Sequence, residues 1–260
     1  MYNPGRSVRA LFRKQPKLPA LSGTAFVFGA APEPFVPREL LDTAWIVTAN
    51  ASQVYLERFG IDKPAVTFMR SNMGLGAPTD AVKQDALRDR STGLLLLFAS
   101  RHDPDCVEQL EILDRVNYRY DNLRVMDRLE CCMIHNRLLD AKVPFLIKRF
   151  RPSMGMRAIL FSLDMGADQV AVSGISLRVG GWSISDMSYD MQHVQGDVEC
   201  FERIRRLRLP VLAVEEQLAA DTGLPRWQGN WAPGALSPNV TKPPAQPDAV
   251  QPPQGAASVQ

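Results

Sequence analysis

The sequence is poor in the residues that build metal sites and disulfides. Its 260 residues include 4 cysteines and 3 histidines. Cys106, Cys131, Cys132 and Cys200 show no Cys-x-x-Cys spacing, and no histidine forms a ligand pair with any of them. We therefore expect no metal site, and we expect the cysteines to be reduced thiols in a hydrophobic core.

Long apolar runs are also missing. No segment approaches the ~18–20 apolar residues that span a bilayer, and the N-terminus lacks the apolar stretch of a signal peptide. The hydrophobic fraction of 45% and charged fraction of 22% are those of a soluble globular protein. We expect a cytoplasmic protein.

An excess of one charge is absent except at the N-terminus. Lysine and arginine total 30 against 28 acids, a net charge of +2, which argues against a nucleic-acid partner. Residues 1–21 nevertheless carry five basic residues before any acid. This lead-in is interpreted as a flexible solvated arm, and peripheral contact with an anionic membrane surface stays open as the alternative.

Six short apolar runs dominate the rest of the chain. Continuous runs of four to six apolar residues are typical of buried parallel strands. Between several of them lie amphipathic stretches with helical spacing, at 53–59, 105–113, 127–140, 154–165 and 197–207. The alternation predicts a single α/β domain over 22–230 with a doubly wound, mostly parallel, Rossmann-like sheet. The apolar runs are residues 25–28, 45–48, 65–69, 94–99, 170–173 and 211–214.

The last thirty residues differ in composition. Residues 231–260 are rich in proline, glutamine, alanine and serine, with almost no large apolar side chains. Such a segment cannot bury enough surface to offset the entropy of ordering. We predict a disordered tail.

Small polar residues follow the first two predicted strands. Gly29 ends the first strand, and Asn50 and Ser52 follow the second. Open α/β sheets bind ligands beyond the carboxyl ends of their strands, so these residues are candidate nucleotide contacts, although a tight turn and a helix N-cap are alternatives. The chain shows neither the Gly-x-Gly-x-x-Gly pattern of dinucleotide sites nor the Gly-Lys-Ser/Thr of a phosphate-binding loop at these positions.

A second candidate site lies in RPSMG, residues 151–155. Ser153 and Gly155 open a predicted helix, whose N-terminal N–H groups would face an anion such as phosphate. Downstream, His193 has Asp197 one helical turn away. A carboxylate near an imidazole raises its basicity and fixes its tautomer, which suits a general base. A plain N-cap for Ser153 and a surface histidine for His193 are the alternatives.

The order of these segments resembles the sialyltransferases of glycosyltransferase family 29. FVFGAAPEPFVPRELLDTAWIVTAN is similar to their large motif, and RPSMGMRAILFSLDMGADQVAVSGI, which includes Gly174, is similar to their small motif. His193 followed by Asp197 is similar to their very small motif. The resemblance covers residues 24–205 and implies a Rossmann-like fold of the variant GT-A kind.

The resemblance also implies an activity. It implies a CMP-activated donor of a sialic acid-like or Kdo-like sugar, with Gly29, Asn50, Ser52, Ser153, Gly155 and Gly174 along the nucleotide. His193, assisted by Asp197, would be the base that deprotonates a glycan or glycolipid hydroxyl. Transfer would invert the anomeric configuration and use no metal or other cofactor, as in polysaccharide biosynthesis.

Two other interpretations stay open. The strand-Gly-x-x-Pro loop and the Asn-bearing strand also resemble the pterin pyrophosphokinases and their MptE-like relatives, which favour acidic metal ligands after the third strand. Residues 70–72, Arg-Ser-Asn, supply none. A nucleotide-binding or scaffold protein without transfer chemistry is the third interpretation, which Ala30 favours because the family has a polar residue there.

Overall fold

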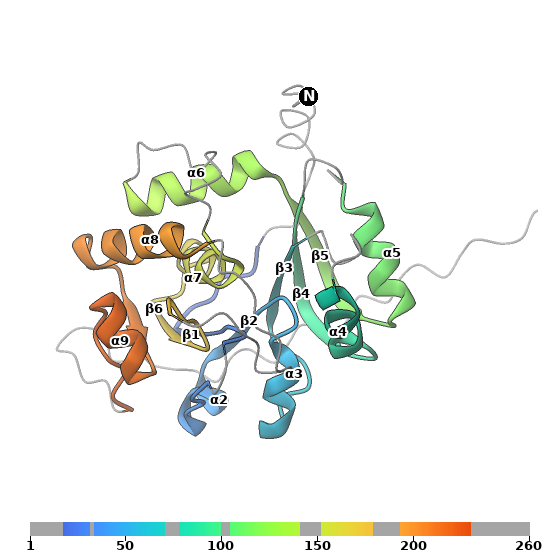
Figure 1. The fold of residues 1–260 in the computed structure, drawn as a ribbon, viewed down its shortest axis with the longest axis horizontal. Coiled ribbons are helices and arrows are strands. Elements are labelled where there is room, and N and C mark those ends of the chain that lie inside the picture. Colours follow the sequence, from blue (N-terminus) through green and yellow to red (C-terminus); the bar gives the residue numbers. More distant parts are fainter. Residues whose placement is uncertain are drawn as a thin grey trace, which may run out of the picture.

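One parallel sheet organises the chain in the computed structural model, which describes residues 18–31, 34–70, 78–99, 105–140, 152–178 and 193–229. Among these residues the sheet has seven strands in the order β5-β4-β3-β2-β1-β6-β7, and every neighbouring pair is parallel (Figure 1). The predicted α/β class with a mostly parallel sheet is therefore confirmed. The strands are β1 (Thr24–Phe28), β2 (Trp45–Ala49), β3 (Val66–Arg70), β4 (Ser91–Phe98), β5 (Arg119–Met126), β6 (Gln169–Ser173) and β7 (Val211–Ala213).

Each of the six apolar runs forms a strand of this sheet. The residues of β1 from Ala25 to Phe28 are all completely buried, as expected for a strand covered on both faces. The seventh strand, β5, is absent from the sequence prediction because its residues, RYDNLRVM, are mostly polar. It pairs only with β4 at the sheet edge, and most of its residues are exposed or half-buried.

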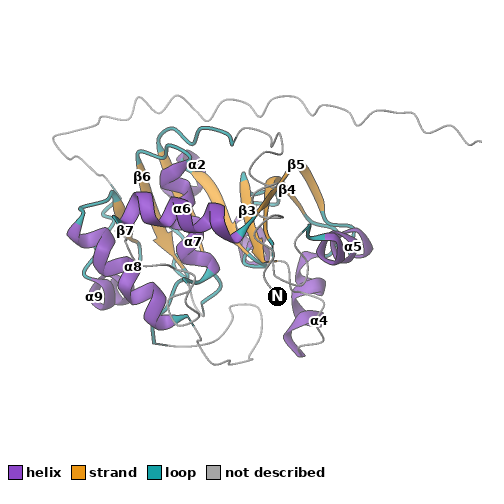
Figure 2. Cartoon of the chain, turned by 90° about the horizontal axis from the view of Figure 1, so that it is seen from above, coloured by secondary structure: helices purple, strands orange, loops and turns teal. Residues whose placement is uncertain are grey.

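Helices cover both faces of the sheet, so the sheet is doubly wound. One face packs against α6 (Arg128–Leu139), α7 (Met154–Asp164) and α8 (Val194–Arg206) around a core that includes Phe68 and Phe161. The other face carries α2 (Arg38–Thr43), α3 (Gln53–Leu56), α4 (Pro78–Leu87) and α5 (Val107–Arg115). Figure 2 shows α8 and α9 (Glu216–Thr222) beside β6 and β7, with α4 and α5 at the opposite end of the sheet.

Three of these helices were not predicted from the sequence. Helix α2 has six residues and α9 has seven, too few for a clear amphipathic period. Helix α4 is longer, but its sequence, PTDAVKQDAL, is only weakly apolar and shows no distinct apolar stripe. The predicted helix over 53–59 is shorter than expected, because α3 ends at Leu56 and a 3-10 turn over Glu57–Phe59 follows.

The basic lead-in and the C-terminal tail, both predicted from composition, lie largely outside the described residues. The lead-in lies there over residues 1–17 and the tail from residue 230 onward. Of the lead-in, Leu21 is completely buried and its N–H donates to the Met165 carbonyl, so packing begins before residue 22. No helix in the described part of the chain has the length and apolar character needed to cross a membrane.

The four cysteines are free and buried, as predicted. Burial raises the pKa of the Cys131 thiol to about 12. A thiol with such a pKa is protonated at neutral pH and chemically inert. The cysteines therefore act as small apolar core residues.

Candidate active site at the carboxyl edge of the sheet

The order in which the chain adds strands to the sheet reverses between β1 and β6. From β1 the chain moves through β2 to β5 on one side, whereas β6 and β7 lie on the other side of β1. In open α/β sheets this switch point forms a crevice at the carboxyl ends of the two central strands, where ligands bind. The predicted residues Gly29 and Gly174 directly follow β1 and β6.

Gly29 and Gly174 touch through their backbones. The Gly29 N–H donates to the Ser173 carbonyl and the Ala31 N–H donates to the Gly174 carbonyl, both at 2.8 Å. A Cβ added to Gly29 would lie 2.2 Å from the Gly174 carbonyl oxygen, and one added to Gly174 would lie 2.6 Å from the Gly29 oxygen. Only glycine fits at either position, and Gly174 also has a positive φ of 68°. The ends of β1 and β6 are thus in direct backbone contact.

Helix α7 begins beside this contact. A Cβ on Gly155 would lie 2.8 Å from Cδ1 of Ile175, the residue after Gly174. Ser153 is the N-cap of α7, and its Oγ accepts a hydrogen bond from the Met156 N–H at 3.1 Å. The N–H groups of Met154 and Gly155 belong to the first turn, where no carbonyl of the helix can accept from them. The predicted anion-binding helix end therefore lies at the switch point.

Asp197 joins the start of α8 to the start of α7. Its Oδ1 accepts a hydrogen bond from the Ser153 N–H at 2.7 Å. Burial of this carboxyl, which is 5% exposed, raises its pKa to about 7, although the hydrogen bonds from Ser153 and the charge of Arg157 act in the opposite direction. An acid with a pKa near 7 can exchange a proton at physiological pH. Asp197 thus holds the start of α8 against the start of α7.

His193 lies one helical turn before Asp197, at the N-cap position of α8. Its side chain is half-buried and does not cap the helix. The Asp197 N–H donates to the His193 carbonyl at 2.9 Å, so the two residues are fixed relative to each other through the backbone. Together with the Asp197–Ser153 contact, this places His193 at the same edge of the sheet as the α7 N-terminus.

The structure assigns different contacts to the two predicted residues after β2. Asn50 adopts a left-handed conformation with φ 55°, and its Oδ1 accepts a hydrogen bond from the Arg70 N–H at 3.3 Å. Ser52 is completely buried, its hydroxyl donating to the Phe28 carbonyl at 2.8 Å and accepting from the Ala49 N–H at 3.1 Å. Ser52 therefore ties the ends of β1 and β2 together beneath the crevice, and in this structure a ligand has no access to it.

Glu215 belongs to the edge of the crevice and was missed from the sequence. Its Oε1 accepts hydrogen bonds from the Gly174 N–H at 2.8 Å and the Phe35 N–H at 3.2 Å, and it lies 2.7 Å from the Ser173 hydroxyl. These contacts hold the loop after β6 in place. They arise because β7 pairs with β6, a pairing that the position of Glu215 in the sequence does not reveal.

Several candidate residues lie outside the described part of the chain. Ser71 and Asn72 after β3, and Arg151 at the start of the small motif, are among them. Within the described ranges, no group of three or more histidine, cysteine or acidic side chains is arranged to hold a metal ion.

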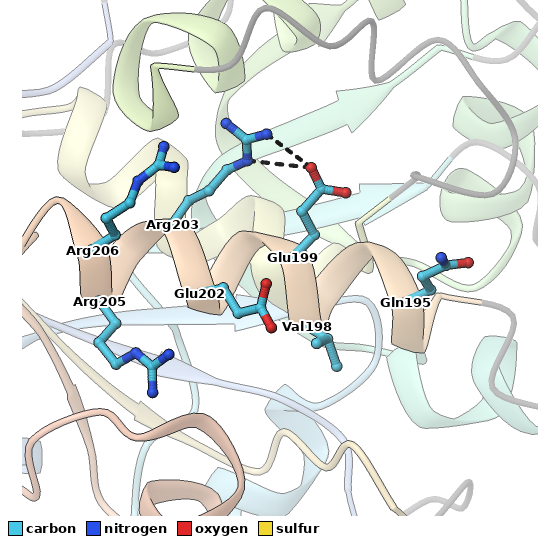
Figure 3. A pocket seen from close by; sticks show the side chains of 7 residues that line it. All are labelled: Gln195, Val198, Glu199, Glu202, Arg203, Arg205 and Arg206. Carbon is cyan, nitrogen blue, oxygen red and sulfur yellow. Dashed lines mark hydrogen bonds and ion pairs between the residues drawn. The ribbon is translucent and has the colours of Figure 1, made fainter.

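An open hollow of about 720 Å³ lies elsewhere, on the outer side of α8. Figure 3 shows that all the side chains lining it come from this one helix, with Arg203 paired to Glu199. The buried face of α8, which includes Asp197 and Cys200, points the other way. The hollow is therefore separate from the switch point. Its lining residues are Gln195, Val198, Glu199, Glu202, Arg203, Arg205 and Arg206.

The buried carboxyl of Asp197 predicts a pH-dependent stability. Its pKa is 3.8 in the unfolded chain and about 7 in the folded protein, so the folded state binds the proton more tightly. Its contribution to stability is complete below pH 4 and is lost as the pH rises through 7, by about 4 kcal/mol at most. Asp197→Asn keeps an acceptor for the Ser153 N–H without the charge, so this loss should disappear.

The measurement is urea unfolding of both proteins from pH 4 to pH 8. The variant should match the wild type near pH 4 and exceed it in stability near pH 8. Asp42→Asn, which changes an exposed acid of α2, controls for removal of a surface charge. Identical pH slopes for the wild type and Asp197→Asn would show that this carboxyl ionises normally in the folded protein.

Comparisons with known proteins find similar solved structures only. No protein-family model and no curated protein matches the chain. Similar solved structures include the Campylobacter jejuni sialyltransferase CstII in complex with cytidine-5'-monophosphate, at 12% identity and a TM-score of 0.44, covering 80% of this chain and 88% of that one. The monofunctional α-2,3-sialyltransferase Cst-I of the same organism is 11% identical with a TM-score of 0.47, covering 89% of each chain. This chain is similar to both in the arrangement of its helices and strands.

Proposed function

We propose that the protein is a glycosyltransferase that moves a sialic acid-like or Kdo-like sugar from a CMP-activated donor to a hydroxyl of a glycan or glycolipid. The observation that carries the proposal is the convergence at the switch point. The Gly29–Gly174 contact, the start of α7 and the start of α8 meet at one edge of the sheet. This brings together the three segments whose sequences resemble the sialyltransferase motifs.

The strand ends and the helix end suit the nucleotide. Gly29 and Gly174 hold the carboxyl ends of β1 and β6 together at the switch point, where open α/β sheets bind ligands such as a ribose or phosphate. The first-turn N–H groups of α7 and its dipole favour the phosphate group, whose negative charge grows as CMP leaves. Asn50, at the end of the neighbouring strand, has an amide that can both donate to and accept from the nucleotide.

The start of α8 suits the proton transfer. In the proposed reaction the acceptor oxygen attacks the anomeric carbon, the bond to the CMP phosphate breaks, and His193 takes the acceptor proton. A single displacement inverts the anomeric configuration. Asp197 fixes the start of α8 against Ser153 and supplies a carboxyl whose pKa of about 7 allows it to share the proton. We propose that this transfer requires no metal and takes place in the cytoplasm.

Calorimetric titration with CMP, with UMP and GMP as controls, tests the donor site. We expect selective binding of CMP to the wild type, because the motif resemblance implies a CMP-activated donor. Asn50→Ala should weaken this binding by about 3–10-fold, the effect of losing one hydrogen bond to the ligand.

Asn117→Ala is the matched control. Asn117 has the same φ of 55° as Asn50 but precedes β5, at the opposite edge of the sheet. Its substitution should leave CMP affinity unchanged, which separates loss of a ligand contact from backbone strain. Absence of CMP binding to the folded wild type would refute the proposed donor, and equal effects of the two asparagine variants would remove Asn50 from the site.

A further inference from the structure

Two arginines that the motif resemblance does not include lie close together at the carboxyl edge. Arg70 is the last residue of β3, and Arg157 lies in the second turn of α7. In β3, Val66 and Phe68 point into the core under α7. Since side chains alternate along a strand, Arg70 points to the same face. The sheet thus directs Arg70 toward the helix that carries Arg157.

Phe98 links the two arginines in space. It is the last residue of β4 and is the direct register partner of Arg70 in the parallel pair β3–β4. The Arg157 guanidinium carbon lies over the Phe98 ring, 5.2 Å from its centroid. Phe161, one helical turn deeper, packs edge-on against the same ring at 5.4 Å. Arg157 therefore stands over the end of β4, next to Arg70 at the end of β3.

Neither guanidinium is neutralised by an acid of the described chain. No ion pair joins Arg70 or Arg157 to a carboxylate among the described residues, and the buried Nε of Arg157 has no hydrogen-bond partner there. Asp197 is near enough for Arg157 to lower its pKa, but its Oδ1 accepts from Ser153. Burial, and then the charge of Arg157, lower the pKa of Arg70. Two like charges are thus held close together, and no described carboxylate forms an ion pair with either of them.

We infer that Arg70 and Arg157 form a subsite for an oxyanion, a carboxylate or phosphate group of the substrate. Guanidinium groups bind both anions through paired N–H donors. The subsite lies two strands from Gly29, or about 10 Å at the usual strand spacing, and one helical turn from the first-turn N–H groups of α7. A ligand that rests on the Gly29–Gly174 contact can therefore extend a second group to the arginines. Its assignment to the donor or acceptor rests on the proposed function.

The test uses thermal shift and calorimetry on the full chain with four probes: CMP, inorganic phosphate, free N-acetylneuraminic acid and the uncharged methyl ester of that sugar acid. Arg70→Gln removes one charge from an exposed side chain. It should weaken binding of the recognised anion by about 10-fold or more, as expected for a charge-assisted hydrogen bond. Arg157→Gln should do the same, and Arg206→Gln, an exposed arginine near the end of α8, should not.

The probes identify the source of the anion. Weaker binding of both CMP and inorganic phosphate to Arg70→Gln assigns the pair to phosphate. Loss of the wild-type preference for the free acid over its ester assigns the pair to the sugar carboxylate. In the absence of ligand, Arg70→Gln should melt at the same or a higher temperature than the wild type, because the repulsion is relieved. If Arg70 served only to stabilise the fold, Arg70→Gln would lower the melting temperature.

Failure of this inference differs from failure of the proposed function. If each probe has the same affinity for the wild type as for both glutamine variants, the arginine pair is not a subsite. This conclusion holds whether or not CMP itself binds. If CMP does not bind but phosphate or the sugar acid binds and is lost in Arg70→Gln, the proposed donor is refuted and the oxyanion subsite stands.

Discussion

Replacing His193 by alanine is expected to lower turnover by about 10²–10⁴-fold, the usual effect of losing a positioned general base. CMP affinity should remain close to that of the wild type, because the nucleotide is assigned to Gly29, Asn50 and the start of α7. The His193 side chain does not cap α8, so alanine removes no capping hydrogen bond. Steady-state kinetics with a CMP-sugar and a glycan acceptor, together with CMP calorimetry, separate the two effects.

The control is Gln195→Ala, an exposed position in the first turn of the same helix. It should leave both turnover and CMP affinity unchanged. The rate of the wild type should also rise with pH as the base loses its proton, whereas His193→Ala should lack this rise. Normal turnover by His193→Ala would remove this residue from the mechanism. CMP binding without transfer in the wild type would instead favour a nucleotide-binding protein that lacks the chemistry.

Substitution in the Gly29–Gly174 contact should strongly lower the free energy of unfolding. A Cβ at Gly29 would lie 2.2 Å from a backbone oxygen and 2.8 Å from the carbonyl carbon of Gly174. Backbone cannot move aside as a flexible side chain can, so Gly29→Ala must push β1 and β6 apart at the switch point. We expect a loss of about 3 kcal/mol in the free energy of unfolding, the upper end of the cost of overpacking, with weaker CMP binding. Urea unfolding measures it.

Gly174→Ala should be at least as damaging, because it adds the strain of a positive φ to a contact of 2.6 Å. Gly60→Ala isolates that strain, since Gly60 has a φ of 77° and nothing lies within 4 Å of the Cβ that alanine would add. It should cost about 1–2 kcal/mol. If all three alanine variants lost the same free energy of unfolding, the close approach of Gly29 and Gly174 would have no energetic consequence.

The strands were largely predictable because burial on both faces leaves a local pattern. A run such as LLLLF in β4 can satisfy neither an exposed helix nor a loop, and the structure places it in the sheet interior. Strand β5 carries no such pattern. Its polar residues form a strand because β4 offers an unpaired edge, and hydrogen bonds to that edge are a tertiary property.

The candidate site was predictable in part for the same reason. Gly29, Asn50 and Gly174 could be assigned to strand ends, and parallel strands bring their carboxyl ends to one edge. Which of these side chains a ligand can reach could not be predicted. Ser52 was a candidate nucleotide contact or helix N-cap, whereas the structure buries it because its hydroxyl bonds to the end of β1.

The α/β class, six of the seven described strands and the residues that end them could be predicted from the chain alone, because each depends on local apolar patterning and on backbone preferences. Which strand ends meet depends on how the strands and helices pack. Three contacts join residues at least 41 positions apart in the sequence. They are the contact of Gly29 with Gly174, the hydrogen bonds of Glu215 to the loop after β6, and the approach of Arg70 to Arg157. Strand order and helix packing create these contacts, and no short-range pattern encodes them.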